Sequence, residues 1–275
     1  MCILFVYVNP SPKEGEYRVI VANNRDEYYH RPALDAQWCE GHILGGKDME
    51  PGREGGMWFG FAIKDLENGK GKKYCIAALL NVTGEKIEHG DGRGRIVKDY
   101  LTTNLSFDQY VKTLEEVNFS GFNFVGIEIS KDDCQVYHYS NTPKIFSVYS
   151  GKETLGFGNS PTYTPLTKVT KGRYQFEEII SRGLNNEELV EELLKLLKNE
   201  TKHLPDEELE KRNPAAYSLL SSIFVKIKDP GYGTRAHSIL LIDYNWNFQF
   251  IEHALKQPID IENPEWNINK IQSRL

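Results

Sequence analysis

The order of strand-like and helix-like segments restricts the fold of this 275-residue chain more than any other feature of its sequence. Short runs rich in Val, Ile and Tyr predict strands, and apolar residues at helical spacing predict helices. Strands are expected at residues 2–8, 17–22, 57–63, 73–81, 122–129, 134–140, 144–149, 237–243 and 248–253. Helices are expected at residues 96–101, 106–117, 166–182, 187–198 and 215–224. Runs of strands separated by runs of helices indicate an α+β fold, with two antiparallel sheets and helices outside them, in one domain covering residues 1–275.

Three segments lead to more specific expectations. Residues 76–80 are apolar on both faces, which predicts a central strand that is covered on both sides. The glycine-rich stretch GGKDMEPGREGGMWFGF, residues 45–61, predicts a loop that leads into the strand at 57–63. The polar segment from about residue 256 is expected to be a loosely held tail.

Charge and hydropathy exclude several classes of function. The chain has 33 basic and 39 acidic residues, a net charge of −6, which argues against the basic footprint of a nucleic-acid-binding protein. No apolar run approaches the ~18 residues of a membrane span. The first residues show neither the pattern of a secretory signal nor that of a transit peptide, so neither is expected.

The four cysteines point to a reducing compartment. Cys2, Cys39, Cys75 and Cys134 form no C-x-x-C pair, so no metal site is expected from them. Wide spacing without a signal predicts reduced thiols and a cytoplasmic location. Cys75 and Cys134 fall in expected strands and are predicted to lie in the core.

Cys2 stands directly behind Met1, at the head of the first apolar run, MCILFVYV. One interpretation is a small hydrophobe that begins a buried strand. The other is chemical: if Met1 is removed, Cys2 carries a thiol nucleophile and a free α-amino group that can act as its base. The position alone favours the first interpretation.

A polar run follows the second expected strand, in the sequence VANNRDEYYHRP. Asn and Asp favour turns, so a solvated turn is one interpretation. The other is a site, because an antiparallel pair of the first two strands places position 2 opposite 22 or 23. That register brings Arg25 and Asp26 beside Cys2.

Six blocks of sequence resemble the NRDE family, whose animal members are the transport and Golgi organization 2 proteins. The blocks are MCILF, NRDEYYHRP, GGKDMEPGREGGMWFGF, LLN, GFGN and PGYGTRAHSILLID, and they extend from residue 1 to about 253. The family is similar to the N-terminal nucleophile hydrolases. The resemblance therefore implies a four-layer αββα sandwich, in agreement with the α+β order.

The resemblance also implies roles for individual residues. By similarity to the penicillin V acylase and bile salt hydrolase group, Cys2 matches the nucleophile and Asp26 the acid that holds its α-amino group. Asn81 and Asn159 match the two oxyanion donors, and Arg235 matches a distal arginine. The sequence departs from that group at position 23, where it has Asn in place of Arg. Arg25 is adjacent to Asp26 and is expected on the other face if the strand continues.

Further ligand-binding candidates lie in the same blocks and in a glycine-rich segment. Arg93 and Arg95 follow glycines and lead into an expected helix, an arrangement that can hold a phosphate or carboxylate. A flexible, arginine-rich surface connection is the alternative for them, and a core role is the alternative for Trp58. The candidates are Asn24, Arg25, Glu27, Trp58, Arg93 and Arg95.

The resemblance implies two main functions and a third. The preferred one is handling of haem or a lipid-type metabolite, with haem as a transported ligand, no required cofactor, peripheral membrane association, and mitochondrial and Golgi association besides the cytoplasm. The runner-up is hydrolysis of an amide or thioester acyl group by Cys2, and the third is organisation of Golgi traffic. No C-x-x-C-H motif selects haem, and the sequence sets no oligomeric state.

Overall fold

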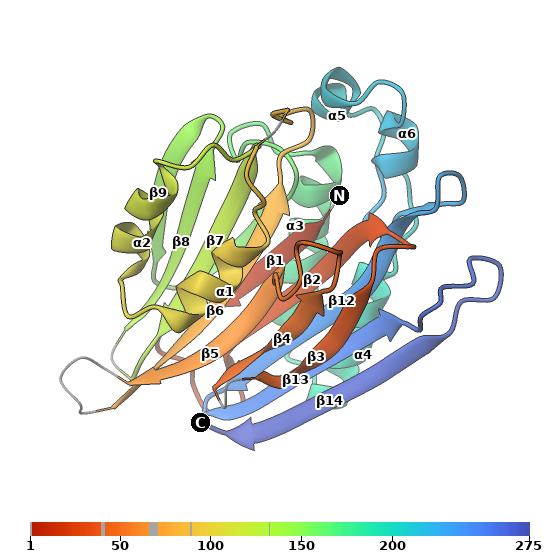
Figure 1. Cartoon of the computed structure of the whole chain (residues 1–275). Helices are drawn as coiled ribbons and strands as arrows, with labels where there is room; N and C mark the ends of the chain where they lie inside the picture. Colours follow the sequence, from red (N-terminus) through yellow and green to blue (C-terminus); the bar gives the residue numbers. More distant parts are fainter. Residues whose placement is uncertain (1, 40–41, 66–70, 89, 132) are drawn as a thin grey trace. The chain divides into compact units, whose positions relative to one another are not determined.

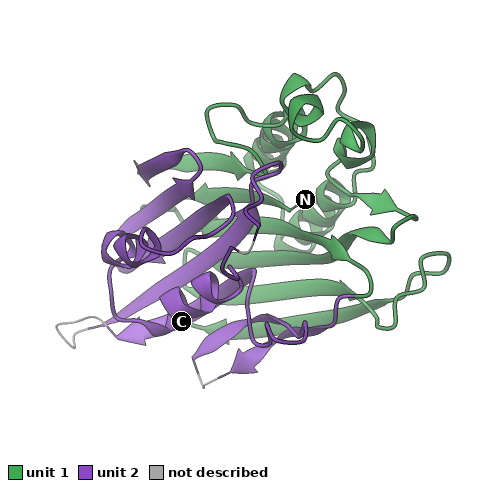
Figure 2. Ribbon diagram, turned by 45° about the horizontal axis from the view of Figure 1, so that its top comes forward, with its two compact units in different colours: residues 1–30, 152–275 green, residues 31–151 purple. Residues whose placement is uncertain are grey.

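The computed structural model describes residues 2–39, 42–65, 71–88, 90–131 and 133–275. Its contacts divide into two units, which Figure 2 draws in different colours: unit 1 is residues 1–30 and 152–275, and unit 2 is residues 31–151. Each unit has one antiparallel sheet with its own helices. The expected mixed class with two antiparallel sheets is therefore confirmed, while the expected single domain stays a prediction.

Unit 1 is built on a sheet whose strand order is β10-β1-β2-β12-β13-β14, with β11 beside β12. Figure 1 labels β1, β2, β12, β13 and β14 of this sheet. All of its neighbouring strands are antiparallel. The strands are β1 (Ile3–Val8), β2 (Tyr17–Tyr28), β10 (Glu153–Phe157), β11 (Lys226–Ile227), β12 (Tyr232–Asp243), β13 (Asn247–Leu255) and β14 (Trp266–Arg274). The helices are α3 (Thr167–Ser181), α4 (Asn186–Leu197), α5 (Glu207–Arg212) and α6 (Tyr217–Leu220).

One face of this sheet packs against α3 and α4. Alternate residues of β1 point to this face, and Phe5 stacks on Phe176 of α3 with ring centroids 5.6 Å apart. A Cβ atom at Gly172 would collide with the Phe5 ring, so glycine lets α3 approach the sheet closely. Four leucines at helical spacing supply the α4 side of the same core: Leu189, Leu193, Leu196 and Leu197.

Unit 2 is a seven-stranded meander, because its strands lie in the sheet in their order along the chain. Two helices, α1 (Arg95–Thr102) and α2 (Phe107–Leu114), contribute to its core. The strands are β3 (Ala33–Cys39), β4 (Ile43–Asp48), β5 (Phe59–Asp65), β6 (Lys72–Asn81), β7 (Phe122–Ile129), β8 (Cys134–Asn141) and β9 (Lys144–Ser150). The strand predicted to be central is β6, between β5 and β7, so that prediction is confirmed.

Three expectations from the sequence are wrong. The glycine-rich loop begins later than expected, because Gly45 and Gly46 belong to β4. A Cβ atom at Gly45 would collide with the Phe59 carbonyl of β5, so this glycine serves close packing within a sheet. The polar tail is not loosely held throughout, because β14 pairs with β13 along its whole length. The helix expected at 215–224 is reduced to α6, and the Ser221 hydroxyl donates to the Ser218 carbonyl at its end.

Candidate functional site

The polar run at residues 23–26 lies inside the sheet of unit 1. Each of these residues is at most 5 % exposed. β1 pairs on one side, with Ile3 opposite Asn24, and β12 pairs on the other, with Thr234 opposite Asp26. The interpretation as a solvated turn is therefore wrong, because backbone pairing with two neighbouring strands keeps the segment extended.

Cys2 lies directly before β1 and is half-buried beside Asp26. Val8 pairs with Val19, whereas an eight-residue loop at 9–16 would pair it with Tyr17. The observed register therefore places position 2 opposite Arg25, and not opposite 22 or 23. The Cys2 Sγ donates a long hydrogen bond of 3.8 Å to the Asp26 carbonyl oxygen. The predicted neighbourhood of Cys2 and Asp26 is thus present within unit 1.

The Asp26 carboxylate is held by a threonine on the adjacent strand. The Thr234 hydroxyl donates to Asp26 Oδ1 at 2.7 Å and accepts a bond from the Val225 amide at 3.0 Å. The Thr234 amide in turn donates to the Val225 carbonyl at 2.8 Å. The orientation of the Asp26 side chain is therefore fixed by β12 and by the segment 222–225 that precedes β11.

Lys168, in the first turn of α3, is a buried cation on the same segment. It is 0 % exposed, and its Nζ donates to the Ser222 carbonyl at 3.0 Å. Asn24 reaches the neighbouring Ile223 carbonyl at 3.1 Å. Three polar side chains from β2, β12 and α3 therefore meet on residues 222–225.

Lys168 lies outside the motifs of the sequence, but its position on α3 marks it as a further candidate residue. The buried residues of α3 are Lys168, Val169, Gly172 and Phe176. This spacing forms one apolar helical stripe, so the lysine occupies a position that faces the core. A lysine at such a position is almost never fully buried without a partner, which marks it as a candidate functional residue.

Burial shifts the protonation of all three ionisable groups. Desolvation raises the pKa of Asp26 above its usual value, and the positive charge of Lys168 counteracts part of that rise. Desolvation lowers the pKa of Lys168, and the charge of Asp26 opposes that shift. Burial also raises the pKa of the Cys2 thiol, so the neutral thiol predominates near neutral pH.

A second bonded group continues from Asn24. Its Nδ2 donates to the Leu197 carbonyl at 2.8 Å as well as to Ile223, which leaves Oδ1 to accept from His237 Nδ1, 2.7 Å away. Burial lowers the pKa of His237 to about 3, so this histidine is neutral. Asn24 therefore ties β2 to α4 and β12, and its predicted ligand-binding role stays a prediction.

Asn159 and Arg235 lie at the same end of the sheet as Cys2. Leu4 pairs with Phe157, and continuing that antiparallel count places Asn159, which is 2 % exposed, opposite Cys2. Arg235 stands at the irregularity of β12 between Thr234 and Ala236, and its Nη1 donates to the Tyr28 carbonyl at 2.9 Å. A bulge of this kind redirects a side chain.

Arg25 and Glu27 complete the motif. Arg25 is buried and, by strand alternation, lies on the face of β2 opposite to Asn24 and Asp26, as expected. Glu27 is half-buried, and its Oε1 accepts a bond from the Tyr28 amide at 2.9 Å. The motif therefore places candidate side chains on both faces of the strand.

The remaining candidates belong to unit 2. Asn81 is the exposed last residue of β6, and Trp58 is half-buried next to Gly46. Arg93 donates to the Gly121 carbonyl at 2.7 Å, and Arg95 is the exposed first residue of α1. The predicted convergence of Asn81 with Cys2 stays a prediction, because the two residues lie in different units.

The structure defines the class of protein as α+β, with a buried polar site beside a cysteine near the start of the chain. The chain belongs to the Transport and Golgi organisation 2 family, whose model matches residues 1–257. It is 36 % identical over 286 residues to Transport and Golgi organization protein 2 of Drosophila melanogaster, covering 99 % of this chain and 98 % of that one. It is 33 % identical to the Homo sapiens homolog, with 93 % of each chain covered. The resemblance read from the motifs is therefore confirmed.

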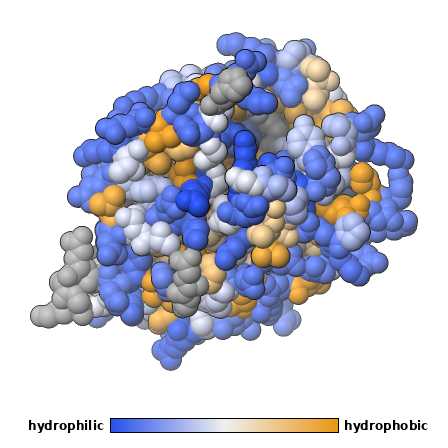
Figure 3. Space-filling view, in the orientation of Figure 1, coloured by the Kyte–Doolittle hydropathy of each residue, from blue (hydrophilic) through white to orange (hydrophobic). Residues whose placement is uncertain are grey.

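The described residues contain neither a metal-binding cluster nor a membrane-spanning helix. They include no group of three or more His, Cys, Asp or Glu side chains placed to hold a metal ion. None of their helices is both long and apolar enough to cross a membrane. On the face drawn in Figure 3, hydrophilic residues predominate and hydrophobic ones form small, separate groups.

Proposed function

We propose that this protein acts in intracellular transport, as a carrier that binds haem or a lipid-type metabolite at the site around Cys2 and Asp26. The names of its relatives support a role in transport and in Golgi organisation. The observation that carries the choice of a carrier is the state of Cys2. Its thiol is partly buried and donates a hydrogen bond to the Asp26 carbonyl, and burial raises its pKa. A thiol in this state is better suited to contact a bound ligand than to act as a nucleophile.

The charges around Cys2 are suited to an amphipathic ligand. Asp26 and Lys168 place opposite charges on the helix-facing side of β2, and Arg235 lies on the adjacent strand. Lys168 and Arg235 can donate hydrogen bonds to the anionic and polar groups of such a ligand. The apolar residues of the neighbouring strands can contact its apolar part. In this proposal haem is cargo, and no cofactor is required.

The alternative function is a cysteine-dependent hydrolase of amide or thioester acyl groups. The observation that favours it is the contact between Cys2 and Asp26, the pair that the resemblance assigns to nucleophile and acid. It requires the two sheets to stack as an αββα sandwich so that Asn81 joins Asn159 as an oxyanion donor. An experimental structure with Asn81 Nδ2 more than ~10 Å from Cys2 Sγ excludes that arrangement, since a hydrogen bond reaches only about 3 Å.

Haem and palmitoyl-CoA titrations distinguish the two functions. A carrier binds one of these probes saturably, releases no free coenzyme A, and changes affinity less than about threefold in Cys2→Ser. A hydrolase releases coenzyme A catalytically and loses turnover in Cys2→Ser. Cys39→Ser is the matched control, because Cys39 is the other half-buried cysteine and lies in β3. Turnover that is lost in Cys2→Ser alone overturns the carrier.

The same proposal includes location. We expect the carrier in the cytoplasm, with association at mitochondrial and Golgi membranes through peripheral contacts. Organisation of secretory traffic at the Golgi is the second alternative, and its support is the relatives' name. Fractionation of cells expressing the tagged chain, followed by a salt wash of the membranes, tests peripheral association.

A further inference from the structure

Unit 1 contains a pocket of about 370 Å³ near the end of β1 that is remote from Cys2. Its floor is formed by Tyr7 with its two cross-strand neighbours, Thr154 and Ile20. Tyr7 lies five positions after Cys2 along the extended chain, which is about 17 Å. The wall is formed by the end of α3 and the loop after it: Glu177, Ile180 and Ser181 from the helix, and Leu184 from the loop. The pocket is therefore distinct from the polar site described above.

Aromatic and apolar groups form most of its inner surface. Tyr7 is only 5 % exposed, and among the described residues its hydroxyl has no hydrogen-bond partner. Its ring already attracts a cation, because Lys152 Nζ lies 5.8 Å from the ring centroid. Tyr17, at the rim, accepts a hydrogen bond from Asn186 at 3.2 Å. Such rings bind ammonium groups through their faces.

The charged lining of the pocket is negative on balance. Glu16 and Glu177 contribute two carboxylates, and Lys152 contributes one cation. Glu16 is held by neutral donors of its own loop, the Lys13 amide at 2.8 Å and Asn9 Nδ2 at 3.3 Å, so its charge is not neutralised there. Glu177 pairs with Arg173 at 3.5 Å at an exposed position, where such a pair is weak.

We propose that this pocket binds an amphipathic organic cation, an amine or quaternary ammonium group attached to a short apolar or aromatic body. The ammonium group lies between the carboxylates and the tyrosine ring faces. The apolar body packs against Ile20, Ile180 and Leu184, and the free Tyr7 hydroxyl accepts a hydrogen bond where the ligand is a protonated amine. The volume is within the range of small-molecule pockets.

Two probes of matched shape and opposite charge test the proposal by calorimetry on the full chain. We expect benzyltrimethylammonium to bind saturably and phenylacetate not to bind. Glu177→Gln is expected to lower the affinity for benzyltrimethylammonium about two- to fivefold. Glu178→Gln is the control, because this exposed neighbour on α3 does not line the pocket. Equal binding of both probes, or no binding of either at 10 mM, overturns the proposal.

Two more variants locate the bound cation and separate this site from the first one. Thr154→Phe is expected to fill the pocket and abolish binding, with a melting curve to check that the chain remains folded. Cys2→Ser is expected to leave the affinity for benzyltrimethylammonium unchanged, whatever becomes of the proposed carrier function. Cation binding that survives Thr154→Phe, or that is lost in Cys2→Ser, contradicts the assigned place.

Discussion

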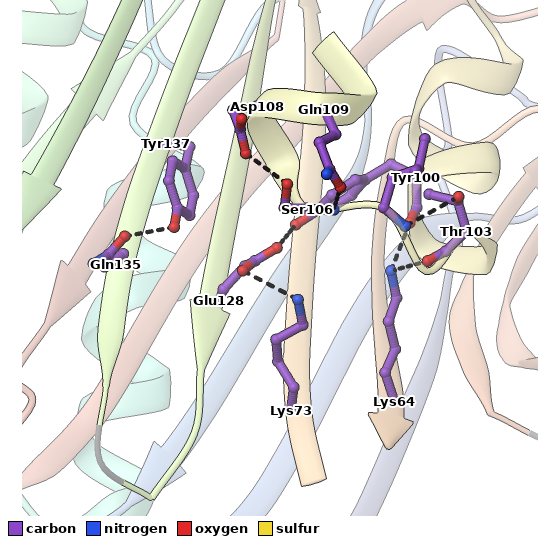
Figure 4. A network of polar contacts seen from close by, with 11 residues as sticks. Lys64, Lys73, Tyr100, Thr103, Ser106, Asp108, Gln109, Glu128, Gln135 and Tyr137 are labelled. Carbon is purple, nitrogen blue, oxygen red and sulfur yellow. Dashed lines mark hydrogen bonds and ion pairs between the residues drawn. The ribbon is translucent and has the colours of Figure 1, made fainter. Parts of the chain in front are cut away.

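Each unit contains a polar network that is packed against its sheet and includes a lysine. The two lysines differ in their exposure and in their direct partners. In unit 2, Glu128 on β7 accepts a bond from the Tyr100 hydroxyl at 2.6 Å and pairs with Lys73 Nζ at 3.2 Å (Figure 4). The Lys73 and Glu128 side chains are 23 % and 14 % exposed, so water still reaches both charges. Every group of this pair has a direct partner of complementary type.

In unit 1, Lys168 is fully buried, and among the described residues its one hydrogen bond is to the Ser222 carbonyl. The nearby carboxylate, Asp26, is bonded to Thr234 instead. Burying an ion costs free energy that only good direct pairing recovers. We infer that the unit 2 network stabilises the fold. The unit 1 network instead holds its charges at a cost in folding free energy, as functional sites do.

Asp26→Ala is the change expected to have the largest effect. It removes the acceptor of the Thr234 hydroxyl and the negative charge that opposes the buried Lys168. We expect a loss of about 3 kcal/mol in the free energy of unfolding, measured with urea. The double variant Asp26→Asn with Lys168→Met removes both charges and is expected to recover at least about 1 kcal/mol. If it is no more stable than Asp26→Ala, the charges do not interact.

Tyr100→Phe makes the corresponding change in unit 2. It removes the 2.6 Å hydrogen bond to Glu128 but leaves the Lys73 pair and the ring in place. Since hydrogen bonds to charged groups are worth about 1.5–3 kcal/mol, we expect a loss of about 2 kcal/mol in urea unfolding. Tyr139→Phe, on β8 of the same unit and equally buried, is the control. Equal losses in both variants would show that the bond to Glu128 contributes nothing specific.

Much of the regular structure could be predicted from local sequence. Ser106 and Gln109 form a capping box before α2, and their spacing in the sequence is typical of that motif. β12 and β13 were also expected as strands, and Ile242 pairs with Phe248 across the turn between them. These elements depend on side chains close together in the sequence.

The edge strand β14 could not be predicted in this way. β14 is mostly polar and exposed, and Ile268 is 69 % exposed. Its strand conformation depends on backbone pairing with β13, where Leu255 meets Trp266, and on the stacking of Trp266 against His237 at 4.8 Å. Tertiary contacts of this kind override local composition.

The candidate site divides in the same way. The neighbourhood of Cys2 and Asp26 could be predicted, because both lie on one β-hairpin and follow from counting its register. Lys168 and Thr234 could not, since a helix 142 positions after Asp26 and a strand 208 positions after it bring them there. Only the place of Lys168 on an apolar helical stripe signalled its burial.

Lys168→Met is expected to make stability depend on pH. Without the cation, the pKa of Asp26 in the folded state rises further above its unfolded value of about 3.9. A raised carboxyl pKa means that the folded state keeps its proton longer, so stability falls as pH rises through that pKa. We expect a loss of about 1 kcal/mol at pH 8 and less at pH 5, from urea unfolding across this range.

The control for this pH series is Lys64→Met in unit 2. Lys64 donates to the Tyr100 and Thr103 carbonyls, both at 2.7 Å, so its loss removes hydrogen bonds to neutral groups. Its effect is expected to be nearly constant between pH 5 and pH 8. A constant effect in Lys168→Met as well would mean that Asp26 does not sense the lysine.

Cys2→Ser is expected to have the smallest effect on stability, below about 1 kcal/mol, because Cys2 is half-buried and its bond to Asp26 is long at 3.8 Å.

The thiols of Cys2 in unit 1 and Cys75 in unit 2 are expected to differ in reactivity. Burial raises the pKa of Cys2, and it raises the pKa of the core thiol Cys75 to about 11. Alkylation by iodoacetamide, followed by peptide mass, should modify Cys2 slowly at pH 7.5 and faster at pH 9, while Cys75 stays unmodified in the folded chain. Rapid modification of Cys2 at pH 7.5, at least as fast as glutathione, would reveal a thiolate and move the balance from carrier to hydrolase.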